Sequence, residues 1–449
     1  MGSIYISDFP DEILLHIFSY LSREELAAGP SHVNRRWQAV CNDDTLWRDS
    51  DYVVGENQTD KEALSLVMSM PQLRVLRLQR MLPSGMLHHV FRTCHSLTEL
   101  EIHWRHKLLP SELSCLVENC PNIERLVVPG QRTTVEHLEL ISKMENLKSL
   151  RFEYRTLTYQ PFRLQQLADG CPKLRCLEIP LQFCAGDELD NFLAVKAGQI
   201  EALELRWMTS DRRCVLPMVA TLCGASLKRL TLGWYDVPID RIASALFSLR
   251  DLVNLQELAA PYAYGLPPGI LAQVFSGAAI CRLKKLDLRS SGLAVDDDAL
   301  LAICRSCLEL CELLLGGCRQ ISDAGLQLLG NGLETLDLSN CCSLGGGAIT
   351  AIARCCPGLR NLQLQCQDMS RLRPGLRHLL GLKKLETLDL TSSIVSVLPL
   401  GLFPKHLHNL RMLKLSFCEG IGVGGLRVLR TLMPQLKIVI GDLVGPEDR

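Results

Sequence analysis

The sequence predicts a small all-α segment followed by an α/β solenoid with the form of a horseshoe. Three observations lead to this prediction. A leucine pattern recurs along the chain after residue 72, helix-like stretches separate its occurrences, and the first 47 residues are patterned quite differently. A chain of 449 residues would otherwise indicate about two to four globular domains, but a solenoid grows without a single large core.

The recurring pattern is Leu-x-x-Leu-x-Leu, with Ile in place of some leucines. It starts at Leu73, Leu97, Ile123, Leu147, Leu174, Ile200, Leu227, Leu255, Leu283, Leu310, Leu333, Leu359, Leu385, Leu410 and Leu436. Successive starts lie 23 to 28 residues apart, within the range of roughly 20–29 residues that is typical of leucine-rich repeats. The last start is degenerate because Val439 replaces a leucine. The sequence therefore predicts about fifteen leucine-rich repeats.

Each repeat is expected to contain one strand and one helix. The Leu-x-Leu that ends the pattern alternates inward and outward positions, as a strand does. Helix-like stretches between the strands include Lys61–Met70, Leu189–Lys196, Ile239–Leu249, Asp297–Ser306 and Ile349–Cys355. One strand and one helix cannot bury their apolar side alone, so neighbouring repeats must stack. The strands then form a parallel sheet on the concave side, with the helices on the convex side.

The cysteines indicate a cysteine-containing subtype of this repeat. The run Cys307-x-x-Leu310-x-x-Leu313-x-Leu315-x-x-Cys318 matches that subtype, and Cys94, Cys120, Cys171, Cys341, Cys356 and Cys418 recur at or near the equivalent positions. We expect buried thiols that cap backbone groups where the chain turns. Cys304-x-x-Cys307 has the spacing of a zinc site, but the repeat register already explains these positions. We expect neither a metal nor a cofactor.

Charge and hydropathy patterning exclude several classes of protein. The chain has 48 Lys and Arg against 49 Asp and Glu, so nothing indicates a nucleic-acid binder or a membrane-surface protein. Asp8, Asp11 and Glu12 near the N-terminus argue against a secretory signal. No run of about 18 apolar residues is present. We therefore expect a cytoplasmic and/or nuclear protein that is not secreted and that has no disulfides.

The first 47 residues carry apolar side chains that so short a segment is not expected to bury by itself. Phe9-Pro10-Asp11-Glu12-Ile13-Leu14 opens an apolar-periodic run through Ile17, Phe18 and Leu21, and Val33 to Trp37 and Leu46-Trp47 follow. Phe18, Trp37, Leu46 and Trp47 are expected to need a second surface. That surface is predicted to belong to another protein, because the rest of the chain is built differently.

This segment resembles an F-box. The family pattern is an apolar residue and Pro, an acidic–aliphatic pair, an apolar-periodic helix, Val-x-Arg-x-Trp and a closing Leu-Trp. The resemblance implies that the adaptor-binding residues are Phe9, Pro10, Ile13, Leu14, Ile17, Phe18, Leu21, Leu26, Val33, Trp37, Leu46 and Trp47. One departure is Gly29-Pro30, which lies where the family has a continuous helix, because Pro30 removes a backbone donor and can break a helix.

The resulting domain boundaries are 3–49 for the F-box, 50–72 for a linker and first capping helix, 73–440 for the leucine-rich-repeat solenoid and 441–449 for a C-terminal tail. The whole chain is similar to F-box and leucine-rich-repeat proteins. That resemblance implies a non-catalytic substrate receptor of an SCF-type cullin–RING ubiquitin ligase. The F-box would bind a Skp-type adaptor and, through it, a cullin–RING module, while the repeats hold a protein substrate for ubiquitination.

Two rows of residues on the predicted concave side are candidates for substrate contact. The row two positions past the last strand leucine contains Trp104, Tyr154, Trp207, Trp234 and Tyr262, with Phe417 near the end. The row between the last two leucine positions contains Glu101, Glu178, Glu204, Asp287, Asp337 and Asp389. The five aromatic residues together with Glu101 and Glu204 are the predicted substrate contacts, which favour a basic, partly apolar peptide. Alternatively, the aromatics seal neighbouring turns and the acids are simply solvated.

Catalysis has no support in the sequence, because no nucleophile elbow, zinc-protease pair or phosphate-binding loop is present. Two alternatives to the ligase function stay open. One is a free-standing repeat scaffold or inhibitor that keeps the N-terminal segment only as a cap. The other is a small-ligand co-receptor, for which we see no strongly basic polyphosphate pocket.

Overall fold

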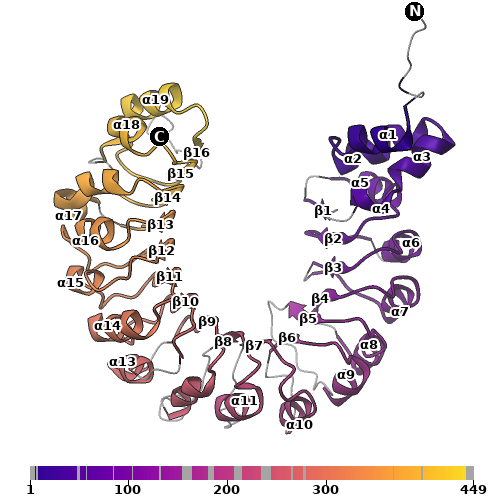
Figure 1. Cartoon of the computed structure of the whole chain (residues 1–449), viewed down its shortest axis with the longest axis horizontal. Helices are drawn as coiled ribbons and strands as arrows, with labels where there is room; N and C mark the ends of the chain where they lie inside the picture. Colours follow the sequence, from indigo (N-terminus) through magenta and orange to yellow (C-terminus); the bar gives the residue numbers. More distant parts are fainter. Residues whose placement is uncertain are drawn as a thin grey trace, which may run out of the picture. The chain divides into compact units, whose positions relative to one another are not determined.

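The computed structural model describes residues 6, 9–47, 51–56, 58–83, 85–103, 105–130, 133–153, 164–180, 187–206, 215–233, 244–263, 266–276, 280–367, 369–395 and 398–440. The chain divides into two compact units, Met1–Ile200 and Glu201–Arg449. Within each unit a strand is followed by a helix or helical turn, again and again (Figure 1).

The N-terminal unit opens with a helical segment that holds the predicted F-box. It consists of α1 (Asp11–Phe18), α2 (Arg23–Ala28), the 3-10 turn η2 (Pro30–His32), α3 (Arg35–Cys41) and α4 (Asp44–Trp47). Helix α2 begins at a capping box, in which Ser22 and Glu25 each accept a backbone N–H of the other. Asn34 caps α3 by accepting the N–H of Trp37 at 2.8 Å.

The helix break expected at Gly29-Pro30 is present. Helix α2 ends at Ala28, and Pro30 is the first residue of η2, where its missing N–H costs no helical hydrogen bond. The Ser31 hydroxyl donates to the carbonyl of Ala27 at 2.7 Å and so bridges the interruption. Two short helices therefore replace one long helix, and η2 packs against both α2 and α3.

The helical segment has a core of its own, which corrects the expectation that Phe18, Leu46 and Trp47 need an external surface. These three side chains are 2%, 4% and 2% exposed within the chain. The Phe18 ring meets Trp37 edge to face at 5.2 Å between centroids. The Trp47 indole donates to the carbonyl of Cys41 at 2.5 Å. Several short helices that pack together thus enclose apolar side chains that a single amphipathic helix would leave exposed.

The repeats of the N-terminal unit form parallel strands in chain order. The strands are β1 (Asp51–Val54), β2 (Val75–Leu78), β3 (Glu99–Glu101), β4 (Arg125–Pro129), β5 (Ser149–Glu153) and β6 (Cys176–Pro180). The helices are α5 (Asp60–Met68), α6 (Met86–Thr93), α7 (Pro110–Asn119), α8 (Val135–Ile141), α9 (Gln165–Gly170) and α10 (Glu188–Val195). The sheet begins one strand before the first leucine pattern, because Asp51-Tyr52-Val53-Val54 pairs with β2 although it lacks that pattern. The segment 50–72, expected as a linker and a capping helix, therefore contains β1 as well as α5.

The C-terminal unit continues the same arrangement. Its strands are β7 (Ala202–Arg206), β8 (Arg229–Leu232), β9 (Glu257–Ala259), β10 (Lys285–Asp287), β11 (Glu312–Leu314), β12 (Thr335–Asp337), β13 (Asn361–Gln363), β14 (Thr387–Asp389), β15 (Met412–Lys414) and β16 (Lys437–Val439). Its helices are α11 (Leu216–Cys223), α13 (Ile270–Phe275), α14 (Asp297–Ser306), α15 (Asp323–Leu326), α16 (Ala348–Cys355), α17 (Met369–Leu372), α18 (Phe403–His406) and α19 (Val423–Leu432), with 3-10 helices η5 (Phe247–Asp251), η7 (Arg373–Gly381) and η8 (Leu400–Leu402). The described part of the predicted helix Ile239–Leu249 leads into η5.

The central leucine of each pattern sets the register of the strands in each unit. In the N-terminal unit Leu76, Leu100, Leu126, Leu150 and Leu177 stand opposite one another on successive strands. In the C-terminal unit the same row is Leu203, Leu230, Leu258, Leu286, Leu313, Leu336, Leu362, Leu388 and Leu413. All are at most 2% exposed. Each side chain fully buried in this way stabilises the fold by about 1.5–3 kcal/mol.

Buried thiols tie consecutive repeats together. Cys318, Cys341 and Cys418 donate from Sγ to the carbonyl of the last strand leucine in the preceding repeat, at 3.3, 3.3 and 2.9 Å. Burial raises the pKa of the Cys318 and Cys341 thiols to about 12. Both therefore stay protonated and act as donors to backbone oxygens where the chain leaves the strand.

Replacement of Phe18 by alanine is expected to destabilise the helical segment by about 3–5 kcal/mol, because its ring is enclosed by the chain and leaves a cavity. Ile13→Ala removes a half-exposed side chain and is expected to cost less than about 1 kcal/mol. Urea unfolding followed by Trp fluorescence measures both. Similar losses for the two variants would contradict an internal core around Phe18.

Candidate protein-docking surfaces

The outer surface of the helical segment exposes apolar side chains at the start of α1 and before α3. Phe9, Ile13 and Val33 are 36%, 44% and 57% exposed, and Pro10 is exposed beside them in sequence. Arg36 of α3 bonds the carboxylate of Asp11 at 2.8 Å and the carbonyl of Phe9. This contact holds the start of α1 against the first turn of α3. Val33 lies just before Asn34, the residue that caps α3.

The predicted adaptor-binding residues fall into three groups by burial. Phe9, Pro10, Ile13 and Val33 are exposed; Ile17, Leu21 and Trp37 are half-buried; Leu14, Phe18, Leu26, Leu46 and Trp47 are buried. Only the first two groups present atoms that a partner can contact in this structure. The third group builds the core that holds them in place.

One exposed aromatic of the segment was not among the predicted residues. Tyr20 follows α1 and is 77% exposed, and its hydroxyl lies 3.5 Å from Nε2 of His16. It falls outside the family pattern, and the sequence signal for it is an aromatic residue in the apolar-periodic run, between Phe18 and Leu21. Tyr20 extends the apolar surface to the far end of α1.

The outward strand positions of the N-terminal unit carry paired charges. Arg77 on β2 lies 3.0 Å from Asp51 and 3.8 Å from Glu101. Arg151 on β5 lies 3.0 Å from Glu178. A small hollow at β2, β3 and β4 is lined by residues that include Arg77, Glu99, Glu101 and Arg125. The predicted substrate residue Glu101 is therefore half-buried and shares its charge with a neighbouring strand.

The acids of the C-terminal unit are buried rather than solvated. Asp287, Asp337 and Asp389 are 5%, 4% and 2% exposed. Each carboxylate accepts the backbone N–H two residues further on, from Arg289, Ser339 and Thr391, at 2.9 to 3.1 Å. This is an Asx turn, which directs the chain away from the strand. The alternative that these acids are simply solvated is wrong. Glu204 on β7 is also buried, at 8% exposed.

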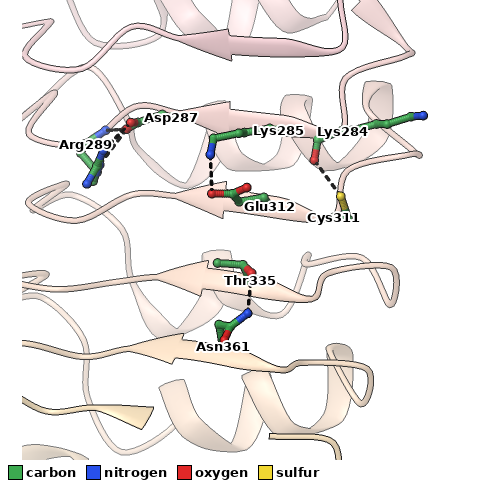
Figure 2. A network of polar contacts seen from close by, with 8 residues as sticks. All are labelled: Lys284, Lys285, Asp287, Arg289, Cys311, Glu312, Thr335 and Asn361. Carbon is green, nitrogen blue, oxygen red and sulfur yellow. Dashed lines mark hydrogen bonds and ion pairs between the residues drawn. The ribbon is translucent and has the colours of Figure 1, made fainter. Parts of the chain in front are cut away.

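Polar contacts run across β10 to β13 (Figure 2). Asp287 accepts two hydrogen bonds from the Arg289 guanidinium, Lys285 pairs with Glu312 at 2.7 Å, and Asn361 donates to Thr335 at 3.1 Å. At least one member of each pair is partly exposed to solvent, so single pairs contribute little stability. Their effect is to neutralise charge along this surface.

The row two positions past the last strand leucine has an unusual backbone. In the C-terminal unit its members with a left-handed backbone are Tyr262, Ser290, Gly317, Asn340, Cys366, Ser392 and Phe417, with φ between 54° and 82°. At Ser290, Asn340 and Ser392 the N–H donates to a carbonyl of the next repeat. Gly and Asn tolerate this conformation, whereas an aromatic residue there is strained.

Tyr262 and Phe417 nevertheless occupy this strained position with 45% and 70% of their surface exposed. Neither ring is enclosed by the fold. Of the predicted aromatic substrate residues only Tyr262 lies among the described residues, since Trp104, Tyr154, Trp207 and Trp234 lie outside them.

Over the described part of the chain, no group of three or more His, Cys, Asp or Glu side chains is arranged to hold a metal ion. None of the described helices is long and apolar enough to cross a bilayer.

Comparison with known proteins identifies the N-terminal segment. Residues 6–52 match the family model described as F-box-like. An F-box/LRR-repeat protein of Arabidopsis thaliana is 28% identical over 187 residues, which cover 37% of this chain and 53% of that protein. The F-box protein SKIP1 of Arabidopsis thaliana is 24% identical over 230 residues, covering 37% and 76%. The chain thus spans about half the length of the first of these relatives.

Solved structures give a weaker likeness. A chain in the crystal structure of the Rad7 and Elc1 complex in yeast aligns with a TM-score of 0.46 and 16% identity, covering 98% of this chain and 91% of that one. A score of this size supports no functional argument. The F-box-like match, the similar F-box/LRR-repeat proteins and the stacked parallel strands together show a chain that combines an F-box with leucine-rich repeats.

Asp389→Asn is expected to lower the free energy of unfolding at pH 7 by about 1–3 kcal/mol. Burial alone would raise the pKa of Asp389, but the hydrogen bonds from Thr391 and the pairing with Lys414 outweigh it and hold that pKa below its usual value. The charged form therefore stabilises the fold above the unfolded-state pKa of about 3.9, and this contribution is lost as the pH falls through the lower folded-state value.

Urea unfolding at a series of pH values measures this effect. Exposed Asp298 is the matched control, and Asp298→Asn should leave stability almost unchanged. A deficit of Asp389→Asn that persists undiminished near pH 2 would rule out the charge as its cause.

Phe417→Asn is expected to raise the free energy of unfolding by about 1 kcal/mol, because Asn tolerates a left-handed backbone better than an aromatic residue does. The reverse exchange at the equivalent position, Asn340→Phe, should destabilise by a similar amount, since Asn340 has a φ of 55° and is exposed. Thermal unfolding of both variants tests the strain. Stabilisation by Asn340→Phe would argue against it.

Proposed function

We propose that this protein is the substrate-recognition subunit of an SCF-type cullin–RING ubiquitin ligase. In this proposal the F-box binds a Skp-type adaptor, which connects it to a cullin–RING module, and the repeats hold a protein substrate for ubiquitination. The subunit itself is non-catalytic and works in the cytoplasm and/or nucleus. The F-box-like match over residues 6–52 and the similar F-box/LRR-repeat proteins support this proposal.

The observation that carries the adaptor part is the exposed apolar surface on an otherwise closed helical segment. Phe9, Ile13 and Val33 remain open to solvent after the segment has buried Leu14 and Phe18. Burial of such side chains against a partner yields about 1.5–3 kcal/mol each. Several together can offset the entropy lost on association. An apolar surface with this organisation is better explained by docking than by capping of the first repeat.

The substrate part rests on the exposed ring of Tyr262, whose backbone is strained. Other repeats place Ser, Gly or Asn at this position, and an exposed aromatic ring there has a strained backbone. Tyr262 is therefore proposed as a substrate contact, and Trp104, Tyr154, Trp207 and Trp234 share its place in the sequence pattern. Aromatic side chains give much of the binding energy at protein interfaces. Glu101 and Glu204 stay in the proposal as secondary contacts, because Glu101 is already paired and Glu204 is buried.

The adaptor proposal is tested by the double variant Ile13→Asp, Val33→Asp. It is expected to weaken binding of a purified Skp-type adaptor by more than about a hundredfold, because two apolar contacts are lost and two charges are desolvated. Isothermal titration calorimetry with the full chain measures the affinity. Leu14 and Phe18 are unsuitable targets, since their substitution opens the core.

The matched control is Val253→Asp, Leu308→Asp, which changes two exposed apolar residues of the C-terminal unit, 48% and 80% exposed. It should bind the adaptor as the unaltered chain does. Undiminished adaptor binding by the F-box variant, or no binding by the unaltered chain, would favour a repeat scaffold that acts outside a ligase.

A further inference from the structure

The last part of the C-terminal unit is strongly basic in a chain that is neutral overall. Residues 369–440 contain eleven Lys and Arg but three Asp and Glu, whereas the whole chain has 48 against 49. Two of the three acids are already engaged. Glu386 pairs with Arg360 of the preceding repeat at 2.5 Å, and Asp389 pairs with Lys414 at 3.1 Å. Little negative charge is left to balance the remaining cations.

A row of charged residues that crosses the sheet contains no acid after Glu386. The residue after the first leucine of each repeat alternates in sign as Glu334, Arg360 and Glu386, and Arg360 contacts both acids. The next two positions are Arg411 and Lys437, which lie on adjacent strands because the N–H of Lys437 donates to the Arg411 carbonyl. Arg411 thus continues the alternation after Glu386, whereas Lys437 stands where the alternation would place an acid.

More cations gather where the helices lead into these strands. Lys383 Nζ lies 3.3 Å from both Nδ1 and the carbonyl oxygen of His406 at the end of α18. The pKa of His406 lies below its usual value because of burial and because Lys383, Lys405 and His408 repel its charged form. Asn409 donates to the carbonyl of Lys383 at 2.8 Å and fixes the two repeats together.

The basic edge is defined as Lys383, Lys384, Lys405, Arg411 and Lys437, all of which are exposed. Among the described residues none of the five forms an ion pair. Lys383 has a structural explanation, since a cation at the end of a helix caps its carbonyls and complements its dipole. The other four side chains have no hydrogen bond or ion pair in the described structure. Their mutual repulsion is removed when an anionic partner binds.

The surroundings favour a polypeptide over a nucleic acid as that partner. Single-stranded nucleic acids stack their bases on exposed aromatic rings. In 369–440 the exposed aromatic is Phe417, which follows β15 and lies beyond the opposite end of that strand from Arg411. Leu432 ends α19 and is 62% exposed, and a short turn, in which the Leu436 N–H donates to the Met433 carbonyl at 2.9 Å, connects it to Lys437. Cations beside an exposed leucine match an acidic segment that also carries aliphatic side chains.

We propose that the basic edge of the C-terminal unit is a docking site for an acidic, leucine-containing polypeptide segment. This site is distinct from the F-box surface and from the row that contains Tyr262. It does not depend on whether the chain serves a ubiquitin ligase.

The test uses the full chain and a fluorescein-labelled peptide of about 15 residues that repeats Glu-Glu-Leu, with fluorescence anisotropy as the readout. The unaltered chain is expected to bind it and to lose affinity between about 0.1 and about 0.3 M NaCl. The triple variant Lys384→Gln, Lys405→Gln, Lys437→Gln is expected to bind at least about tenfold more weakly. These side chains are exposed and unpaired, so the thermal midpoint should not change.

The matched control is Lys61→Gln, Lys143→Gln, Lys284→Gln, which removes three exposed lysines elsewhere and changes the net charge equally. It should retain the affinity of the unaltered chain. Equal weakening in both triple variants, or no binding to the unaltered chain, would overturn the site. A single-stranded RNA of equal charge that binds more tightly than the peptide would overturn the polypeptide as its occupant.

Discussion

The structure of this protein depends on the burial of one leucine per strand against its counterparts in the neighbouring repeats. Leu286, Leu313 and Leu336 illustrate this row, since each stands opposite the next and is fully enclosed. Because side chains alternate along a strand, a leucine fixed inward turns the residues on either side of it outward. The charged pairs between neighbouring strands follow from this register.

Residues beside the buried leucines either bond the backbone of the chain itself or remain exposed to solvent. Polar residues beside the buried leucines first have to satisfy the chain itself, as Asp287 and Asp389 do by accepting backbone N–H groups at the strand end. Thiols such as that of Cys318 satisfy the backbone by donating to a carbonyl of the preceding repeat. Side chains that are exposed and make no such bond with the backbone are accessible to partners. The exposed ring of Phe417 and the exposed cations Lys384 and Lys437, which form no ion pair in the described part of the chain, are such side chains.

The F-box shows a similar division between buried residues, which hold the helices in place, and exposed residues, which make up the surface. Leu14, Phe18 and Trp47 are buried, and their enclosure holds Ile13 and Val33 in the open. The sequence pattern treats all of them alike, since each is an apolar residue at a position typical of the family. Short helices that meet at different angles do not share one apolar face. Exposure is therefore set by the packing of α1, η2 and α3 and not by periodicity along the chain.

The sequence by itself determined the repeat, its strand positions and the kind of N-terminal domain, because these depend on spacing and residue type along the chain. It also located the helix break at Pro30, which is a local property of the backbone. The tertiary structure alone decided that β1 opens the sheet, that Phe18 and Trp47 are internal, and that Asp287, Asp337 and Asp389 are buried. It also brought Lys383 to His406 and left Arg411 without an ion pair in the described part of the chain. These outcomes depend on which residues from different repeats become neighbours, and spacing within one repeat carries no information about that.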